Sequence, residues 1–337
     1  MQIQENNIQS VYFLGIGGIG MSALARYFHS IGYRVGGYDR TPSALTAALE
    51  QEGIEIIYED NIDKIPIWAQ QQQAHCLIVR TPAVPAETAI FQWFVRGDYD
   101  IRKRAEVLGL VTRQKHALCV AGTHGKTTTS TLLAHILYQS DVSTNAFLGG
   151  ISENYHTNLL LDKQSDFVVV EADEYDRSFH HLTPYMTVIT SVDPDHLDIY
   201  GTAQAYRESF EHYSSLVQRT IIMKYGANMT PRLKSCVKLY TYGTCTEADF
   251  HAENMRLGAD GHFTYDLRTP DGVIRDIYVG TLGALNVENS IAAAAVCLCN
   301  GVDAQKVRHA IGTFTGVKRR LDVHVNKDDI TYIDDYA

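Results

Sequence analysis

The sequence has no excess of positive charge, no long apolar run and no regular cysteine pattern. Of its 337 residues, 29 are Lys or Arg and 39 are Asp or Glu, giving a formal net charge of −10. This charge disfavours nonspecific nucleic-acid binding, which needs a basic footprint. Apolar runs such as 167–170 and 291–298 are far shorter than the roughly 20 residues that cross a bilayer. The opening residues also lack the basic and apolar parts of a signal peptide. We therefore expect a cytoplasmic protein that binds neither nucleic acid nor membrane.

The six cysteines do not suggest a disulfide framework or a zinc site. None belongs to a C-x-x-C pair, and Cys297 and Cys299 lie in an Ala-rich stretch of helical character. Free thiols in a reducing compartment are the simpler interpretation. A chain of this length exceeds one ordinary core, so at least two domains are expected.

Strand-like and helix-like stretches alternate along the chain, which predicts an α/β fold built on mostly parallel sheets. From about 240 to 279 the sequence shows strand-like alternation of residues, interrupted by Asp-Gly and Gly-His turns. This pattern predicts a segment of antiparallel strands. Strands are expected at 11–14, 34–38, 54–57, 76–79, 117–121, 167–170, 187–190, 220–223 and 330–337, and helices near 21–31, 102–112 and 132–138.

A glycine-rich loop, GIGGIG at 15–20, follows the first strand and opens a helix, and Asp39 ends the next strand. In dinucleotide-binding folds such glycines let the backbone approach a diphosphate, while the helix start supplies N–H groups and a positive dipole end. The pattern leaves open whether the diphosphate belongs to NAD or to a UDP-sugar. A tight turn without a ligand is the alternative.

A second loop, VAGTHGKTTT at 120–129, lies between an apolar strand and a helix-like run. Gly122 and Gly125 free the backbone to wrap phosphate oxygens, and Lys126 neutralises them. Thr127 is placed to hold Mg²⁺. The stretch departs from the full G-x-x-x-x-G-K-[ST] pattern, because valine replaces the first glycine. It predicts nucleotide binding; a glycine-bounded turn before an amphipathic helix would leave the lysine unexplained.

Groups suited to metal binding follow two later strands. Glu171 opens the segment EADE after the strand at 167–170, where an acid beside a phosphate loop can hold a metal ion. His196 lies in DPDHLD, flanked by carboxylates that would orient its ring. A structural histidine at a strand end is the alternative. Three nearby acids are expected to be solvated or supporting: Glu174, Asp176 and Asp195.

Seven segments in order resemble the Mur ligase family over essentially the whole chain. They are GIGGIGMSALA, AGTHGKTTT, EADE, DPDHLDIYG, GALNVENSIAAAA, GVKRRLD and the terminal DDYA. The first loop and the histidine of AGTHGKT are similar to the alanine-adding branch. The resemblance implies a ligase of peptidoglycan precursor synthesis that uses ATP and Mg²⁺. Its substrates would be UDP-N-acetylmuramate and L-alanine, joined through an acyl phosphate.

The resemblance also implies roles for individual residues. The UDP diphosphate would lie on Gly17, Gly18, Ile19 and Gly20, in the loop that also holds Gly15 and Asp39. The ATP phosphates would lie on Gly122, Thr123, His124, Gly125, Lys126, Thr127 and Thr128, and the adenine on Asn286 and Asn289. Thr127, Glu171 and His196 would hold Mg²⁺, Arg320 would contact the γ-phosphate with Arg319 as a supporting charge, and His124 would lie near the muramoyl carboxylate. Helix capping is the alternative for both asparagines.

The resemblance divides the chain into an N-terminal Rossmann-like, UDP-sugar-binding domain (1–108), a larger P-loop-type ATPase domain with an antiparallel subsheet (109–325), and a hinge with the start of a C-terminal domain (326–337). We therefore expect this chain to bind nucleotides but to ligate poorly alone. Several family members carry a carbamylated lysine after the Asp-His motif; 206–213 has none, and Glu211 is a candidate substitute. The alternatives are a sibling ligase that adds a recycled peptide, an NAD-dependent dehydrogenase, and a nucleotide-binding module without catalysis. The oligomeric state stays open.

Overall fold

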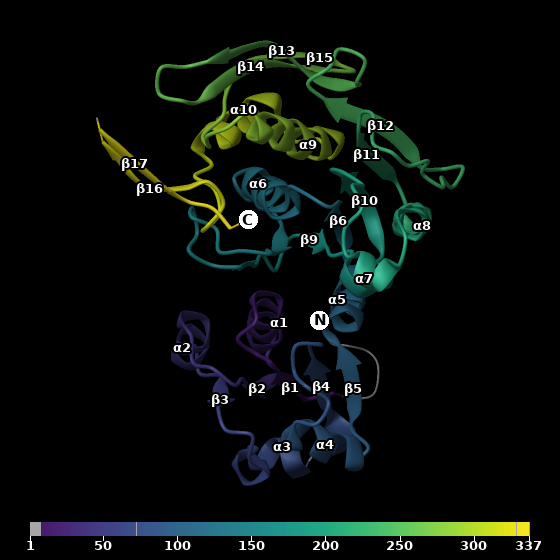
Figure 1. Ribbon diagram of the computed structural model, residues 1–337, viewed down its shortest axis with the longest axis vertical. Coiled ribbons are helices and arrows are strands. Elements are labelled where there is room, and N and C mark those ends of the chain that lie inside the picture. The colour runs from purple at the N-terminus through teal and green to yellow at the C-terminus, as the bar shows by residue number, and fades with distance from the viewer. Residues whose placement is uncertain (1–7, 72, 328, 337) are drawn as a thin grey trace. The chain divides into compact units, whose positions relative to one another are not determined.

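The computed structural model describes residues 8–71, 73–327 and 329–336. The chain divides into two compact units, the first ending at Val111 and the second beginning at Thr112 (Figure 1). Helix α5 (Arg104–Arg113) carries the chain from one unit to the other. In the described residues, no helix is both long and apolar enough to cross a membrane.

The first unit is built on a five-stranded parallel sheet of order β3-β2-β1-β4-β5. The central strand β1 is buried along its whole length. The chain moves outward in opposite directions from β1 and β4, and in such sheets ligands bind where the order reverses. Its elements are β1 (Ser10–Leu14), α1 (Ile19–Ser30), β2 (Arg34–Tyr38), α2 (Ala44–Gln51), β3 (Glu55–Ile57), η1 (Ile62–Lys64), α3 (Ile67–Gln71), η2 (Gln73–His75), β4 (Cys76–Arg80), α4 (Ala89–Arg96) and β5 (Asp100–Lys103).

The second unit contains a ten-stranded sheet of order β15-β14-β13-β12-β11-β10-β6-β9-β7-β8. Strands β7, β9, β6, β10, β11, β12 and β13 pair in parallel, and β13, β14 and β15 form antiparallel pairs. The strands are β6 (His116–Ala121), β7 (Asn145–Phe147), β8 (Leu159–Leu160), β9 (Phe167–Ala172), β10 (Pro184–Ile189), β11 (Thr220–Lys224), β12 (Lys238–Gly243), β13 (Phe250–Leu257), β14 (Phe263–Thr269) and β15 (Gly272–Tyr278).

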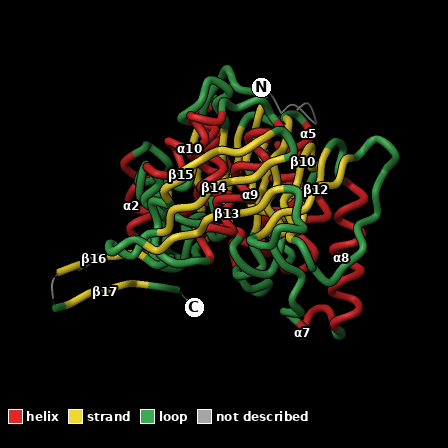
Figure 2. Tube along the Cα trace, turned by 90° about the horizontal axis from the view of Figure 1, so that it is seen from above, coloured by secondary structure: helices red, strands yellow, loops and turns green. Residues whose placement is uncertain are grey.

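Helices α6 and α9 pack against each other in the core of this unit (Figure 1). The four alanines at 292–295 in α9 are fully buried, and their small side chains allow close approach. Seen from above, β13 and β14 lie across α9, while β15 packs against α10 (Figure 2). The helices are α6 (Lys126–Tyr138), η3 (Tyr175–His181), α7 (Leu197–Tyr200), α8 (Ala203–Leu216), α9 (Leu285–Cys299) and α10 (Ala304–Thr313).

The predicted α/β fold, with mostly parallel sheets and an antiparallel subsheet, is confirmed. Four details differ. The antiparallel region begins only at β13, because β12 pairs in parallel with both of its neighbours. Strand β5 was not anticipated, and α6 begins at Lys126 rather than near 132. The terminal strand β17 (Ile330–Asp334) is paired, forming an antiparallel hairpin with β16 (Asp322–Lys327).

Candidate functional site

The loop between β6 and α6 contains two glycines in the left-handed region, Gly122 with φ 136° and Gly125 with φ 77°. A Cβ atom at Gly122 would lie 2.0 Å from Thr190 Oγ1, and one at Gly125 would lie 2.9 Å from Asn289 Oδ1. Glycine is therefore required at both positions. No side chain caps the start of α6. The uncapped helix start and its positive dipole end favour an anion.

Hydrogen bonds tie this loop to the segment that follows β10. The Thr123 N–H donates to the Ser191 carbonyl at 3.2 Å, and the Thr123 hydroxyl donates to the Asp193 carbonyl at 2.7 Å. The same hydroxyl lies 2.8 Å from the Tyr206 hydroxyl. The His124 N–H donates to Ser191 Oγ at 3.0 Å, while the His124 ring is exposed. The loop is thus held in shape by bonds that leave the His124 side chain accessible.

The ammonium of Lys126 is bound within the protein at the first turn of α6. Its Nζ donates to the Gly122 carbonyl at 2.7 Å and to the Glu174 carboxylate at 2.8 Å. Glu174 is only 2% exposed. Burial raises the pKa of the Glu174 carboxyl, and the nearby Lys126 charge opposes that rise. Of the two roles expected for Glu174, solvated or supporting, the structure agrees with the supporting one, because its buried carboxylate binds the phosphate-loop lysine.

The predicted metal-binding groups Thr127 and Glu171 are adjacent. The Thr127 hydroxyl donates to Glu171 Oε2 at 2.9 Å. Burial raises the pKa of the Glu171 carboxyl, opposed by the charge of Lys126 and by the Thr127 hydrogen bond. His196, the residue before α7, has Nε2 3.9 Å from Glu174 Oε1. The chain thus brings a hydroxyl, two carboxylates and an imidazole to one end of the sheet.

These donors fit a magnesium ion that is shared with a bound phosphate. Among the described residues, no group of three His, Cys, Asp or Glu side chains is assembled as a ready metal cage. Mg²⁺ does not need such a cage, because it usually keeps several waters and binds one or two carboxylates together with substrate phosphates. The Thr127–Glu171 contact supplies that kind of partial site.

Gly149, a residue whose role was not predicted, makes room for Glu171. A Cβ atom there would lie 2.0 Å from Glu171 Oε2. We expect Gly149→Ala to displace the carboxylate from Thr127 and to raise the Mg²⁺ concentration needed for activity by about tenfold or more. The measurement is the Mg²⁺ dependence of phosphate release.

Stability should change little in this variant, because the clash involves the end of a flexible side chain. Gly243→Ala is the matched control, since a Cβ there meets only ordinary contacts at 3.8–4.0 Å. An unaltered Mg²⁺ requirement in Gly149→Ala would mean that the position of Glu171 does not matter for the metal. The Gly-Gly pair that follows β7 was the available sequence signal.

Asn286 and Asn289, expected at the adenine, are buried where α9 meets α6. Asn289 Oδ1 accepts from the Thr129 hydroxyl at 3.1 Å, and Asn289 Nδ2 donates to Asn286 Oδ1 at 2.9 Å. Asn286 Nδ2 donates to the Leu282 carbonyl at 2.7 Å. The pair thus connects α9 to the helix that carries the phosphate loop. Their contact with adenine stays a prediction, as does the role of the half-buried Thr128.

Arg320 contacts the end of the described chain. Its Nη1 donates to the Tyr336 carbonyl at 2.7 Å, and its guanidinium lies 5.4 Å from the centre of the Tyr336 ring. Arg319 lies over the same ring at 5.0 Å, with its Nε 3.8 Å from Asp334 Oδ2. The predicted contact of Arg320 with the γ-phosphate therefore stays a prediction.

In the first unit, the loop at residues 15–20 is held by a close contact at Gly15 and by a hydrogen bond from Gly17 to Asp39. Gly15 has φ 85°, and a Cβ there would lie 2.5 Å from Thr81 Cγ2. The Gly17 N–H donates to Asp39 Oδ2 at 2.8 Å, and the Thr41 N–H donates to Asp39 Oδ1 at 3.2 Å. Asp39 therefore connects the glycine loop to the segment that follows β2. Gly18 precedes α1, which begins at Ile19, includes Gly20 and has no side-chain cap. This uncapped helix start suits a diphosphate.

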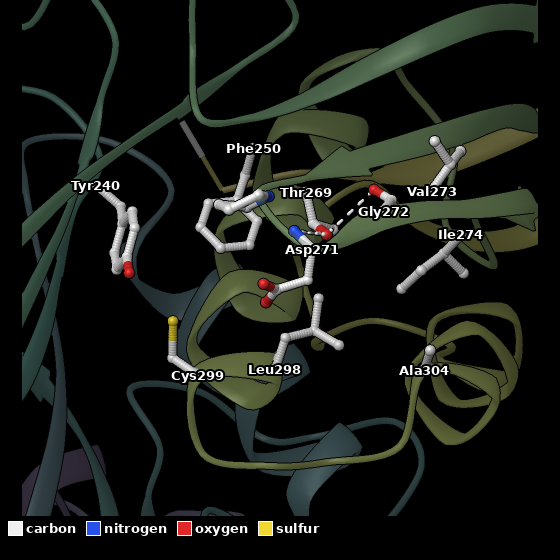
Figure 3. Close-up of a pocket in the computed structure, with 11 residues that line it drawn as sticks. Tyr240, Phe250, Thr269, Asp271, Gly272, Val273, Ile274, Leu298, Cys299 and Ala304 are labelled. Carbon is white, nitrogen blue, oxygen red and sulfur yellow. Dashed lines mark hydrogen bonds between the residues drawn. The ribbon is translucent and has the colours of Figure 1, made fainter.

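A separate cavity of about 330 Å³ lies between β12, β13, the β14–β15 turn and the ends of α9 and α10 (Figure 3). Tyr240, Phe250 and Cys299 line one part of it, and Asp271 lies at the turn. The residues predicted for nucleotide or metal binding are not among those that line it. The cavity is therefore distinct from the phosphate loop.

Comparison with known proteins gives consistent matches. Residues 10–116 match the model of the Mur ligase family catalytic domain, and 120–297 match that of the Mur ligase middle domain. The UDP-N-acetylmuramate–L-alanine ligases of Parabacteroides distasonis and Flavobacterium johnsoniae are 53% and 44% identical, over 98% of this chain and 72% of each relative.

Solved structures agree with these matches. The UDP-N-acetylmuramate–alanine ligase of Thermotoga maritima aligns with a TM-score of 0.84 and 29% identity, over 97% of this chain and 74% of that one. The UDP-N-acetylmuramate:L-alanyl-γ-D-glutamyl-meso-diaminopimelate ligase of Neisseria meningitides aligns with a TM-score of 0.77 and 25% identity. That match covers 93% of this chain and all of the other.

Proposed function

Because the chain belongs to the Mur ligase family, we propose that it is the catalytic part of an ATP-dependent UDP-N-acetylmuramate–L-alanine ligase of peptidoglycan precursor synthesis. The observation that carries the proposal is the meeting of Lys126, Thr127 and Glu171 at the uncapped start of α6. A dehydrogenase would have no use for these groups. Relatives of that printed name, up to 53% identical over nearly the whole chain, support the substrate assignment.

The proposed reaction has two steps. The γ-phosphoryl group of ATP passes to an oxygen of the lactyl carboxylate, ADP leaves, and an acyl phosphate forms. The amine of L-alanine then attacks the carbonyl carbon. The bond between that carbon and the bridging oxygen breaks, so inorganic phosphate leaves with this oxygen, and the new amide nitrogen releases its surplus proton. The first step is needed because a carboxylate resists nucleophiles at neutral pH.

The protein's part in this reaction is positioning and charge neutralisation. Lys126 would leave Glu174 to contact the β- and γ-phosphates, while the N–H groups at the start of α6 face the same anion. Thr127 and Glu171 would hold one Mg²⁺, and His196 would help to hold a second. Mg²⁺ would supply Lewis-acid neutralisation of the phosphoryl oxygens. Arg320 and His124 would complete the site at the γ-phosphate and at the muramoyl carboxylate.

In the first unit, the diphosphate proposed for the glycine loop is that of the UDP-sugar. In NAD-binding folds the acid after the second strand contacts a ribose hydroxyl. Here both oxygens of Asp39 already accept hydrogen bonds from backbone N–H groups, one of Gly17 in the glycine loop and one of Thr41. This use of Asp39 favours a UDP-sugar over NAD.

Phosphate release by the complete protein with ATP, Mg²⁺ and UDP-N-acetylmuramate tests the proposal. We expect release to require both the sugar nucleotide and L-alanine. Release that responds to a peptide but not to L-alanine would move the assignment to the peptide-adding sibling ligase. No release under any condition would leave a nucleotide-binding module.

The chain matches about 72% of the length of its curated relatives. We propose that residues 1–337 alone bind nucleotide and form product poorly, because the remaining length of the relatives would supply contacts to ATP and to the amino acid. Nucleotide binding and product formation measured side by side test this point. Robust ligation by residues 1–337 would refute it.

A further inference from the structure

Glu174 is a buried carboxylate with incomplete pairing. Its Oε1 accepts a hydrogen bond from Lys126 Nζ at 2.8 Å. Its Oε2 lies equally near the ammonium but outside hydrogen-bond geometry, so Oε2 has no hydrogen-bond partner among the described residues. A buried carboxylate oxygen without a partner is costly and calls for an explanation such as an absent ion.

The surroundings of Glu174 fix its backbone and place a second metal-binding group opposite its carboxylate. The Tyr200 hydroxyl donates to the Glu174 carbonyl at 2.5 Å, which holds the backbone in place. Nε2 of His196 lies 3.9 Å from Glu174 Oε1. Two ligand atoms of one octahedral cation, each about 2.1 Å from it, lie about 3.0 Å apart when adjacent and about 4.2 Å apart when opposite. The observed separation of these two atoms is therefore in the range of a shared ion.

Lys126 has two incompatible demands on it in the proposed reaction. In the structure its ammonium neutralises Glu174, whereas a phosphate-loop lysine must contact the nucleotide phosphates. When Lys126 moves to the phosphates, Glu174 loses its counter-ion while it remains buried. A cation that arrives with the nucleotide would restore that pairing.

We propose that Glu174 ligates a divalent cation together with His196 once a nucleotide has drawn Lys126 away, so that Lys126 holds the place of this cation in the nucleotide-free protein. This inference rests on the proposed function and adds a ligand to its second metal. Asp195 is the competing carboxylate, because its Oδ2 lies 3.8 Å from the same imidazole nitrogen. Its side chain is 52% exposed, however, and water can satisfy it.

The test uses Mn²⁺ as the probe, measured by electron paramagnetic resonance in the complete protein with a saturating non-hydrolysable ATP analogue. We expect Glu174→Gln to weaken one Mn²⁺ by about tenfold or more. The exposed Glu208→Gln is the matched control and should bind Mn²⁺ as the wild type does. If Asp195→Asn causes the loss and Glu174→Gln does not, Asp195 is the ligand and the proposal is wrong.

A second readout separates metal binding from a role in positioning Lys126. Affinity for the same analogue is measured in EDTA, without any divalent cation. If Glu174 acted only through Lys126, Glu174→Gln would change this metal-free affinity and leave Mn²⁺ binding intact, which would overturn the proposal. Glu174→Asp keeps the charge on a shorter side chain. A folded Glu174→Asp variant with unweakened Mn²⁺ binding would also count against the proposal.

The outcome also distinguishes this inference from the proposed function. If the wild type binds both the analogue and Mn²⁺ but Glu174→Gln matches it, only the role of Glu174 falls. If the wild type binds neither ligand, the ATP-dependent ligase assignment falls, and this inference falls with it.

Discussion

Lys126→Ala is expected to lower the turnover number for phosphate release by about 10²–10³-fold, the effect of losing one electrostatic stabiliser. The ammonium lies at the first turn of α6, beside the uncapped helix start, within 2.8 Å of two internal oxygen acceptors. In the proposed reaction it would exchange Glu174 for the charge on the transferring phosphoryl group. The measurement is turnover of the complete protein at saturating ATP, UDP-N-acetylmuramate and L-alanine.

The same substitution removes the counter-ion of a buried carboxylate, and breaking a buried pair costs about 3–5 kcal/mol of stability. The double variant Lys126→Ala/Glu174→Gln removes the unpaired charge, so it should recover stability without recovering turnover. Lys163→Ala, at an exposed lysine, is the control for loss of a lysine as such. Unchanged turnover in folded Lys126→Ala would end the assignment of Lys126 to phosphoryl transfer.

The sequence predicts those parts of the structure that depend on short-range patterns. The loops at 15–20 and 120–129 each follow a buried strand and open a helix, as expected from their glycines. Apolar runs located four strands of the first sheet and the parallel strands β6, β9, β10 and β11 of the second, because buried parallel strands are nearly continuous in hydrophobicity. Thr127 and Glu171 meet as predicted, since Glu171 lies near the end of β9 and Thr127 follows β6, the parallel neighbour of β9.

Contacts between distant segments were not predictable in the same way. Glu174 reaches Lys126 across 48 residues, and directly after Glu174 the chain bends at Asp176 and Arg177, which have positive φ values. No local pattern marks this bend. Asn289 meets Thr129 across 160 residues only because α9 packs on α6. Such contacts follow from tertiary packing, and the spacing of residues within one sequence does not predict them.

The pairing of strands in the second unit shows the same limit. Alternating residues and turn signals favoured antiparallel strands from about 240, yet β12 pairs in parallel with β11 and β13. Alternation reports that one face of a strand is buried, but it does not report the direction of the neighbouring strand. The direction of a strand is set by the connection that leads to it. Residues 225–237, which connect β11 to β12, form no helix, so no helical pattern in the sequence indicated a crossover between parallel strands.

The second large effect concerns His135 in the interior of α6, which is only 2% exposed. Its Nδ1 lies 2.9 Å from the Tyr155 hydroxyl and its Nε2 lies 3.1 Å from Thr313 Oγ1. Burial, together with a smaller effect of the nearby His309, lowers the pKa of His135 from an ordinary value of 6.5 to about 4. Folding therefore opposes protonation of this ring.

The direction of the pH effect follows from that depressed pKa. Above pH 6.5 the ring is neutral in both the folded and the unfolded chain, and its contribution to stability is complete. As the pH falls from 6.5 toward 4, the unfolded chain takes up the proton first and stability is lost. The gap between the two pKa values corresponds to about 3 kcal/mol of unfolding free energy.

Comparison of the wild type with His135→Gln isolates this effect from other titrations. We expect the wild type's advantage in unfolding free energy to shrink by about 3 kcal/mol between pH 7.5 and pH 4. Urea unfolding should be followed by far-ultraviolet circular dichroism, because Trp68 and Trp93 both lie in the first unit. His156→Asn is the control, since its side chain is exposed and asparagine tolerates its φ of 53°. If the wild-type and His135→Gln curves ran parallel across this range, the ring would not be held neutral by its burial between α6, Tyr155 and Thr313.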